Sequence, residues 1–89
     1  MAWTVLVHPD AKIELSKVPA RERVAIDAAL EKLRVVGPAL GFPHSSAVRG
    51  SSGGVRELRP WQGRSAWRAF YRQTGPALVV GAIGPRGRS

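Results

Sequence analysis

The sequence predicts an α+β fold in which two helices cover one face of an antiparallel sheet. Three observations support this class. A β-rich stretch opens the chain, helix-forming residues dominate positions 20–36, and three β-rich segments follow position 54. A chain of 89 residues can build one modest core, so residues 1–89 are expected to form a single domain. The expected order is β-α-α-β-β-β, with a helical hairpin on one face and the charge on the other.

The first strand is expected over residues 3–8, where apolar side chains at both alternating positions suggest an inner strand. Pro9 and Asp10 end this strand and offer an N-cap for a short helix that continues to Lys17. The sequence therefore predicts an inner strand that is followed directly by a turn and a short helix.

A longer helix is expected over residues 20–36, which are rich in Ala, Leu, Glu, Arg and Lys. Gly37 and Pro38 follow it and favour termination of the helix at that point. The side chains expected to form its buried stripe recur at helical spacing and are Ile26, Leu30 and Leu33.

The second half of the chain is expected to supply three strands. Residues 40–54 are rich in Gly and Ser and predict a loop. The continuous apolar run at residues 78–83 indicates a central strand. The expected strands cover about 55–59, 66–73 and 77–83.

Composition narrows the possible functions. The sequence contains no cysteine, so neither a disulfide framework nor a thiolate metal site is available. Its two histidines, His8 and His44, lack metal-ligand spacing, and we expect no metal and no cofactor. No apolar run reaches the roughly 20 residues that span a bilayer, and no signal peptide opens the chain. A cytoplasmic protein is therefore expected.

The net charge of +8 is distributed unevenly along the chain. Residues 1–33 contain five basic and five acidic residues, whereas residues 34–89 contain nine arginines, no lysine and a single acid, Glu57. A polyanion is the simplest partner for such a segment, and nucleic acid is the commonest polyanion. Arginine in place of lysine suits planar, bidentate contacts with phosphate or guanine.

Arginines with aromatic residues between them occur in the segment that is most informative about function. It comprises residues 57–59 and 67–72, which are expected to form adjacent strands joined by a loop containing Pro60 and Gly63. Arginines on rigid strands with aromatic residues between them suit a surface that binds phosphate and stacks on bases. The alternative is an ordinary hairpin whose arginines form a solvated face.

The order of these elements and their motifs resembles the RelE/ParE superfamily of bacterial toxins, most closely the HigB-like, phage-derived branch. The similarity extends over nearly the whole chain. It rests on residues 37–41 (GPALG), 57–59 (ELR), 67–72 (WRAFYR) and 79–84 (VVGAIG).

The resemblance implies the toxin of a type II toxin–antitoxin system, and specifically a metal-independent endoribonuclease that cleaves mRNA in the ribosomal A site. It implies two partners, mRNA on the ribosome and a cognate antitoxin, expected to be a small helix-turn-helix protein. In such chemistry a ribose 2′-hydroxyl attacks the adjacent phosphate. The reaction requires a proton acceptor, cations for the phosphorane and a proton donor for the leaving oxygen.

The resemblance also implies roles for individual residues. Arg68 matches the strand arginine at the scissile phosphate, and Arg86 matches a second arginine just after the last strand. Apart from the resemblance, His44 is the one histidine in the basic half, and because histidine is the usual side chain for proton transfer near neutral pH, it is the third candidate catalytic residue. The candidate RNA-binding residues are Arg56, Arg59, Arg64, Phe70, Arg72 and Arg88.

The sequence departs from the family pattern at one point. Many relatives continue into a C-terminal segment with a catalytic Tyr or His, whereas this sequence ends at Ser89. Strand alternation places Tyr71 opposite Arg68, which favours a core position for the tyrosine. Glu57 is a possible base, but an ion pair with a nearby arginine is the alternative role. The general base therefore stays unassigned.

Two other functions are compatible with the same fold. A ParE-like toxin would inhibit DNA gyrase and would need no nuclease site. A truncated homologue would bind only antitoxin or RNA, and the missing C-terminal segment favours this reading.

Overall fold

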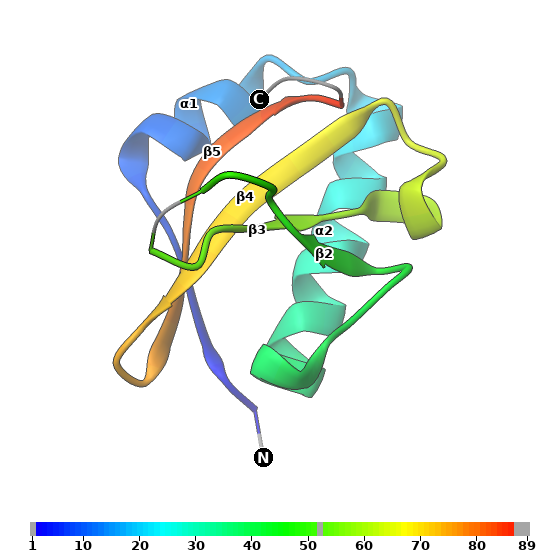
Figure 1. Ribbon diagram of the computed structural model, residues 1–89. Coiled ribbons are helices and arrows are strands. Elements are labelled where there is room, and N and C mark those ends of the chain that lie inside the picture. Colours follow the sequence, from blue (N-terminus) through cyan, green and yellow to red (C-terminus); the bar gives the residue numbers. More distant parts are fainter. Residues whose placement is uncertain (1, 52, 87–89) are drawn as a thin grey trace.

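The computed structural model describes residues 2–51 and 53–86 and confirms the predicted α+β class (Figure 1). Within these residues, two helices and two short 3₁₀ turns accompany a five-stranded sheet. In chain order the elements are β1 (Thr4–Val7), α1 (Pro9–Ser16), α2 (Ala20–Val36), η1 (Gly37–Ala39), β2 (Ser45–Ala47), β3 (Arg56–Leu58), η2 (Pro60–Gly63), β4 (Trp67–Thr74) and β5 (Ala77–Pro85).

The sheet is mixed rather than wholly antiparallel. Its strand order is β1-β5-β4-β3-β2, and β1 runs parallel to β5 while the other neighbours are antiparallel. The predicted inner position of the first strand is wrong, because β1 is an edge strand and Leu6 is 52% exposed. The central position predicted for residues 78–83 is confirmed, since β5 lies between β1 and β4.

The segment expected to be a loop, residues 40–54, contains the short strand β2. Ser45 and Ala47 pair with Leu58 and Arg56 of β3, so β2 forms the second edge of the sheet. Its sequence, Ser-Ser-Ala, has little intrinsic preference for β structure. The pairing with β3, the next strand along the chain, therefore decides its conformation.

Both helices lie on the same face of the sheet, behind the strands in Figure 1, but they pack on different strands. The α1 helix packs on β5, whereas α2 packs against β1 and β4. The predicted bounds of α2 are confirmed, as is the burial of Ile26 and Leu33. The core between the helices and the sheet comprises Ala11, Val18, Ile26, Leu33, Leu40, Leu58, Ala69, Tyr71, Leu78, Val80 and Ile83.

The α1 helix already begins at Pro9, whereas the sequence suggested an N-cap at Pro9 and Asp10, and it ends at Ser16 rather than Lys17. His8 is its N-cap, and the Nδ1 atom of His8 accepts a hydrogen bond from the backbone N–H of Asp10 at 3.1 Å. This contact satisfies one of the free N–H groups of the first helical turn. Within residues 2–51 and 53–86, no helix is long and apolar enough to cross a membrane.

A bulge in β5 explains its continuous apolar sequence. Phe70 pairs with Ala82 and Tyr71 pairs with Val80, so Gly81 has no partner residue on β4. The extra residue shifts the alternation, and Val80 and Ile83 are both buried against the helices despite their odd spacing. Ala82 is thereby left on the opposite face, beside Phe70.

Gly37 has a conformation that side chains do not tolerate. It is the C-cap of α2 with φ 77° and ψ −153°, a region that essentially only glycine adopts. A Cβ atom at this position would also overlap the indole of Trp3. The first residue of the GPALG motif is therefore required both for its backbone conformation and for the packing of Trp3.

Substitution of Gly37 is expected to destabilise the fold. Gly37→Ala should lower the free energy of unfolding by about 2–3 kcal/mol, because backbone strain and displacement of Trp3 both contribute. Gly50→Ala is the matched control, since Gly50 has the same φ of 77° but no heavy atom within 4 Å of its Cβ position. The free energy of unfolding of this control should fall by only about 1 kcal/mol. Urea denaturation of both variants measures the difference, and equal losses would contradict the role of Trp3.

Candidate nucleic-acid interface

The face of the sheet opposite the helices carries several of the predicted site residues. Glu57 pairs with Phe70 across β3 and β4, and Arg68 pairs with Gly84 across β4 and β5. Paired residues share a face of an antiparallel sheet, so these side chains and Arg72 lie together on the open face. The core position predicted for Tyr71 is confirmed, because it is only 3% exposed on the helix-covered face.

Arg68 begins on the open face, but its guanidinium is not free. The residue is 5% exposed. Its Nη1 atom donates to the carbonyl oxygens of Ser65 at 2.8 Å and Trp67 at 2.9 Å. Its Nη2 atom donates to the carbonyl of Gly63 at 3.1 Å. Arg68 thus fastens the end of η2 and the following segment to β4.

Two further arginines and one carboxylate surround Arg68. Burial lowers the pKa of Arg68, the charges of Arg59 and Arg86 lower it further, and the charge of Glu57 raises it. Arginine remains protonated in proteins, so the lowered pKa reflects positive charge held at a cost in free energy. A bound anion would relieve this cost. We call Arg59, Arg68, Arg86 and Glu57 the arginine cluster.

Gly63 joins two of these arginines. Its carbonyl accepts from Arg68, and a Cβ atom at Gly63 would overlap the guanidinium of Arg59. Gly63 has φ 93°, which favours glycine independently of this close approach. Arg86 reaches the same region because its backbone N–H donates to the carbonyl of Ala66 at 2.7 Å. The loop between β3 and β4 therefore assembles the cluster.

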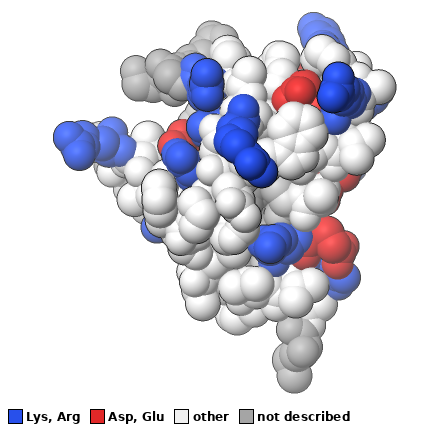
Figure 2. All heavy atoms as spheres, turned by 90° about the vertical axis from the view of Figure 1, so that its right-hand side faces the viewer, with Lys and Arg blue, Asp and Glu red and all other residues white. Residues whose placement is uncertain are grey.

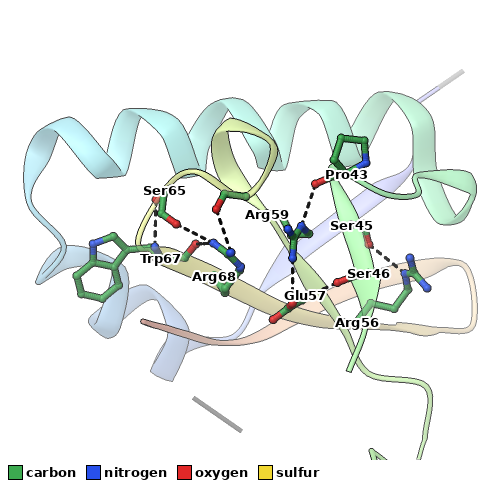
Figure 3. A network of polar contacts seen from close by, with 10 residues as sticks. Pro43, Ser45, Ser46, Arg56, Glu57, Arg59, Ser65, Trp67 and Arg68 are labelled. Atoms are coloured by element: carbon green, nitrogen blue, oxygen red, sulfur yellow. Dashed lines mark hydrogen bonds and ion pairs between the residues drawn. The ribbon is translucent and has the colours of Figure 1, made fainter. Parts of the chain in front are cut away.

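Arg59 and Glu57 form the ion pair that the sequence suggested as the alternative role of Glu57. Arg59 Nη1 lies 3.4 Å from Glu57 Oε1, and Arg59 Nε donates to the carbonyl of Pro43 at 3.0 Å (Figure 3). Ser46 Oγ donates to the same Glu57 oxygen at 3.2 Å. The guanidinium carbon of Arg59 lies 5.0 Å from the centre of the Phe42 ring, a cation–π distance. These contacts hold the Glu57 carboxylate in place.

Other predicted site residues lie away from the open face. Arg56 pairs with Tyr71, so it belongs to the helix-covered side, and its Nε donates to Ser45 Oγ at 3.0 Å. Ser45 Oγ also shares a hydrogen bond with the hydroxyl of Tyr71. Arg88 lies outside the described residues. The arginines predicted to bind RNA are therefore not confined to one face.

His44 and Arg64 line a cleft between α2 and η2 whose volume is 230 Å³. Alanines of α2 form one apolar wall, and Lys32 and Arg59 also line the cleft. The backbone carbonyl of His44 accepts from the N–H of Arg59 at 2.8 Å, which fixes the two segments to each other. His44 is therefore linked to the arginine cluster through Arg59, but its cleft faces α2.

Sequence reasoning missed the strained turn beside this cleft. Trp61 (φ 53°, ψ 39°) and Gln62 (φ 57°, ψ 32°) are consecutive left-handed residues, a conformation that is uncommon outside glycine. Trp61 is 45% exposed, and Phe42, which lies against the Arg59 guanidinium, is 75% exposed. No residue in this turn other than Gly63 carries a signal for positive φ, so the sequence gave no indication of the conformation of Trp61 and Gln62.

Basic side chains do not form one continuous patch on the side seen in Figure 2. Lys and Arg side chains lie there in separate groups, with Asp and Glu side chains among them. In the described parts of the chain, no group of three or more His, Asp or Glu residues is arranged to hold a metal ion.

Comparisons with known proteins agree with this fold. A mutant of the E. coli toxin RelE in its free state is similar with a TM-score of 0.74 and 17% identity, covering 98% of this chain and 86% of that one. A chain of the toxin-antitoxin complex RelBE2 from Mycobacterium tuberculosis gives a TM-score of 0.71 at 21% identity, covering 99% and 95%. A chain of the archaeal RelE-RelB complex from Pyrococcus horikoshii OT3 gives a TM-score of 0.70 at 17% identity, covering 100% of this chain and 100% of that one.

No curated protein matches the sequence significantly. The family model described as Phage derived protein Gp49-like (DUF891) matches residues 13–79, which is most of the chain. The predicted resemblance to RelE/ParE proteins is thus confirmed. The protein belongs to the phage-derived Gp49-like family and has the RelE fold.

Proposed function

We propose that the protein is the toxin of a type II toxin–antitoxin system and cleaves mRNA on the ribosome in the cytoplasm. The observation that supports this most is the arginine cluster, in which the charges of Arg59, Arg86 and Glu57 act on the buried Arg68 and Glu57 is ion-paired with Arg59. Such an arrangement suits the charge that develops on a phosphorane. The RelE fold is consistent with the same activity.

In this proposal the residues of the cluster have distinct roles. Arg86 is exposed and binds the scissile phosphate directly. Arg68 holds the loop that positions Arg59 and adds positive charge from below the surface. Glu57 accepts the proton of the 2′-hydroxyl through Oε2, because Oε1 is occupied by Ser46 and Arg59. Glu57 fits this role better than His44, because it shares the open face with Arg68.

We also propose an antitoxin as the protein partner. Two of the similar structures are toxin–antitoxin complexes. Trp61 is exposed and lines the same cleft as Lys32 and Arg64, and the exposed Phe42 lies against the guanidinium of Arg59. Exposed aromatic side chains beside cations are typical of protein interfaces. An acidic partner segment would complement these charges.

The burial of Arg68 favours one second candidate function. Because its guanidinium already donates to three carbonyls, Arg68 has few donors left for a phosphate. A homologue that only binds RNA or antitoxin would need Arg68 in this structural role and no catalytic role. Transcript cleavage in cells, together with the stability of Arg68→Ala, distinguishes the nuclease from the binding-only function.

Expression in a bacterial host tests the proposed nuclease. The wild-type protein should arrest growth and produce transcript cleavages in frame with translation, mapped by primer extension. Arg86→Ala and Glu57→Gln should each reduce cleavage about a hundredfold or more, since each removes a group that acts in the transition state. Arg21→Ala, which removes an exposed positive charge on α2, is the control and should cleave normally. Growth arrest with intact transcripts would indicate gyrase or another target, and no arrest would favour the binding-only function.

Arg68→Ala is expected to act mainly on stability. It leaves three carbonyl groups without their donor and should lower the free energy of unfolding by about 2–3 kcal/mol. Arg72→Ala alters an exposed residue on the same strand, and its free energy of unfolding should stay within about 0.5 kcal/mol of that of wild type. Chemical denaturation measures both. If Arg68→Ala is as stable as wild type but inactive in transcript cleavage, Arg68 acts on the phosphate rather than on the loop.

The salt dependence of RNA binding tests whether Arg86 contacts phosphate. The affinity of wild type for single-stranded RNA should fall with salt, and Arg86→Ala should reduce the slope of log K against log salt by about 0.7. Arg21→Ala should leave the slope unchanged. Fluorescence anisotropy between about 50 and 200 mM salt measures the slopes. An unchanged slope in Arg86→Ala would remove Arg86 from the phosphate site.

A further inference from the structure

The open sheet face contains a hollow next to the arginine cluster. Two cavities of 320 and 380 Å³ adjoin there, and both are lined by Val55, Phe70 and Ala82. Their size is in the range of small-ligand sites. Phe70 is partly exposed on β4, and Val55 comes from the segment that precedes β3. We call this feature the Phe70 hollow.

The two ends of the Phe70 hollow differ in charge. Glu14 of α1 lines the larger cavity, whereas Arg72 lines the smaller one. Arg72 is exposed, and no carboxylate in residues 2–51 or 53–86 lies within ion-pair distance of it. The hollow therefore offers an apolar surface with an acceptor group at one end and a cation at the other.

The position of Glu14 is fixed by the edge of the sheet. The pairing of β1 with β5 reaches only Val80, so the backbone N–H of Ile83 has no partner on β1. Glu14 Oε1 accepts a hydrogen bond from this N–H at 2.9 Å. This contact occupies one carboxylate oxygen, and Oε2 remains as an acceptor. No Lys or Arg in the described part of the chain forms an ion pair with Glu14.

We propose that the Phe70 hollow binds a nucleobase with an exocyclic amino group, and that Glu14 selects for this group. The base stacks on the Phe70 ring, as bases do on aromatic side chains of single-stranded RNA binders. Its amino group donates to Glu14 Oε2, a contact that carboxylates make with cytosine N4. The phosphate of the same nucleotide lies at the Arg72 end. The inference deepens the proposed function by naming a base preference for its substrate.

The charges of the hollow favour a nucleotide over an acidic peptide. A peptide carboxylate at the Glu14 end would meet a fixed negative charge, which is repulsive. A base is neutral, presents an apolar face to Phe70 and Val55, and offers N–H donors at its edge. Glu14 therefore admits the base at this end and keeps the phosphate at the end formed by Arg72.

Binding of two short RNAs tests the proposal without relying on catalysis. Fluorescein-labelled oligo(C) and oligo(U) of equal length differ in that cytosine has an amino group where uracil has a carbonyl oxygen. Wild type should bind oligo(C) roughly tenfold more tightly than oligo(U) in fluorescence anisotropy. In Glu14→Gln the amide oxygen can still accept from Ile83, but the amide NH₂ now faces the base as a donor. The preference should therefore shift toward oligo(U).

The control variants separate base selection from charge and stacking. Glu31→Gln removes an exposed carboxylate on α2, outside the hollow, and should keep the wild-type ratio of the two affinities. Arg72→Ala should weaken both RNAs and leave the ratio unchanged. Phe70→Leu should weaken both roughly tenfold, because stacking is lost. Thermal unfolding of each variant, followed by circular dichroism, confirms that it is folded.

Three outcomes would overturn the proposal. The first is that wild type binds oligo(C) and oligo(U) with equal affinity. The second is that the ratio of these two affinities is the same in Glu14→Gln as in wild type. The third is that a labelled poly-glutamate peptide binds more tightly than the RNAs and that this binding depends on Phe70. The proposed nuclease activity can be contradicted independently of the proposed base selection. If the ratio shifts as expected but transcripts stay intact in cells, the hollow binds a base without cleavage. If transcripts are cleaved but wild type binds oligo(C) and oligo(U) equally, the proposed nuclease activity is supported and base selection by the Phe70 hollow is contradicted.

Discussion

The hydrogen bonds of the buried Arg68 guanidinium are the interaction on which the candidate site depends. They join β4 to the carbonyls of Gly63, Ser65 and Trp67, and so fix the loop that follows η2. Because Gly63 lies against the guanidinium of Arg59, and the N–H of Arg86 donates to Ala66, the same loop also positions the other two arginines. Holding three like charges together costs free energy, which the carbonyl dipoles and Glu57 offset. The result is a cationic site that is organised before any anion binds, as catalysis by electrostatic stabilisation requires.

Local sequence signals predicted the elements that depend on local interactions. The bounds of α2 followed from helix formers and from Gly37, and the core position of Tyr71 followed from strand alternation. Pairing between strands decided the rest. Only its partner β3 makes β2 a strand, and the edge position of β1 results from its parallel pairing with β5, which no periodicity encodes. The fold class was therefore predictable from the sequence, whereas the order of the strands was not.

The candidate site was predictable in its residue types but not in its geometry. Arginines at positions 59, 68 and 86 were identified from the sequence, and the structure brings them together. The burial of Arg68 could not be foreseen, because it depends on carbonyl groups of a loop in which Trp61 and Gln62 adopt left-handed conformations. Glu14 carried no signal at all, since its contact with Ile83 spans the chain from α1 to β5. Residues of this kind are recognised only when the sheet register is known.

The register also connects the Phe70 hollow to the arginine cluster. Phe70 lies directly opposite Glu57, and the Cβ atoms of such cross-strand pairs are about 4.5–5.5 Å apart. A ribose attached to a base on the Phe70 ring therefore comes within reach of the Glu57 carboxylate. In this arrangement the phosphate on its 5′ side lies at Arg72, and the phosphate on its 3′ side meets the cluster in the direction of Arg68, on the other side of Phe70 along β4. His44 has no equivalent relation to the open face, because its cleft lies against α2. Base binding, proton acceptance and phosphate binding thus follow one another along two paired strands, and this continuity favours Glu57 over His44 as the proton acceptor.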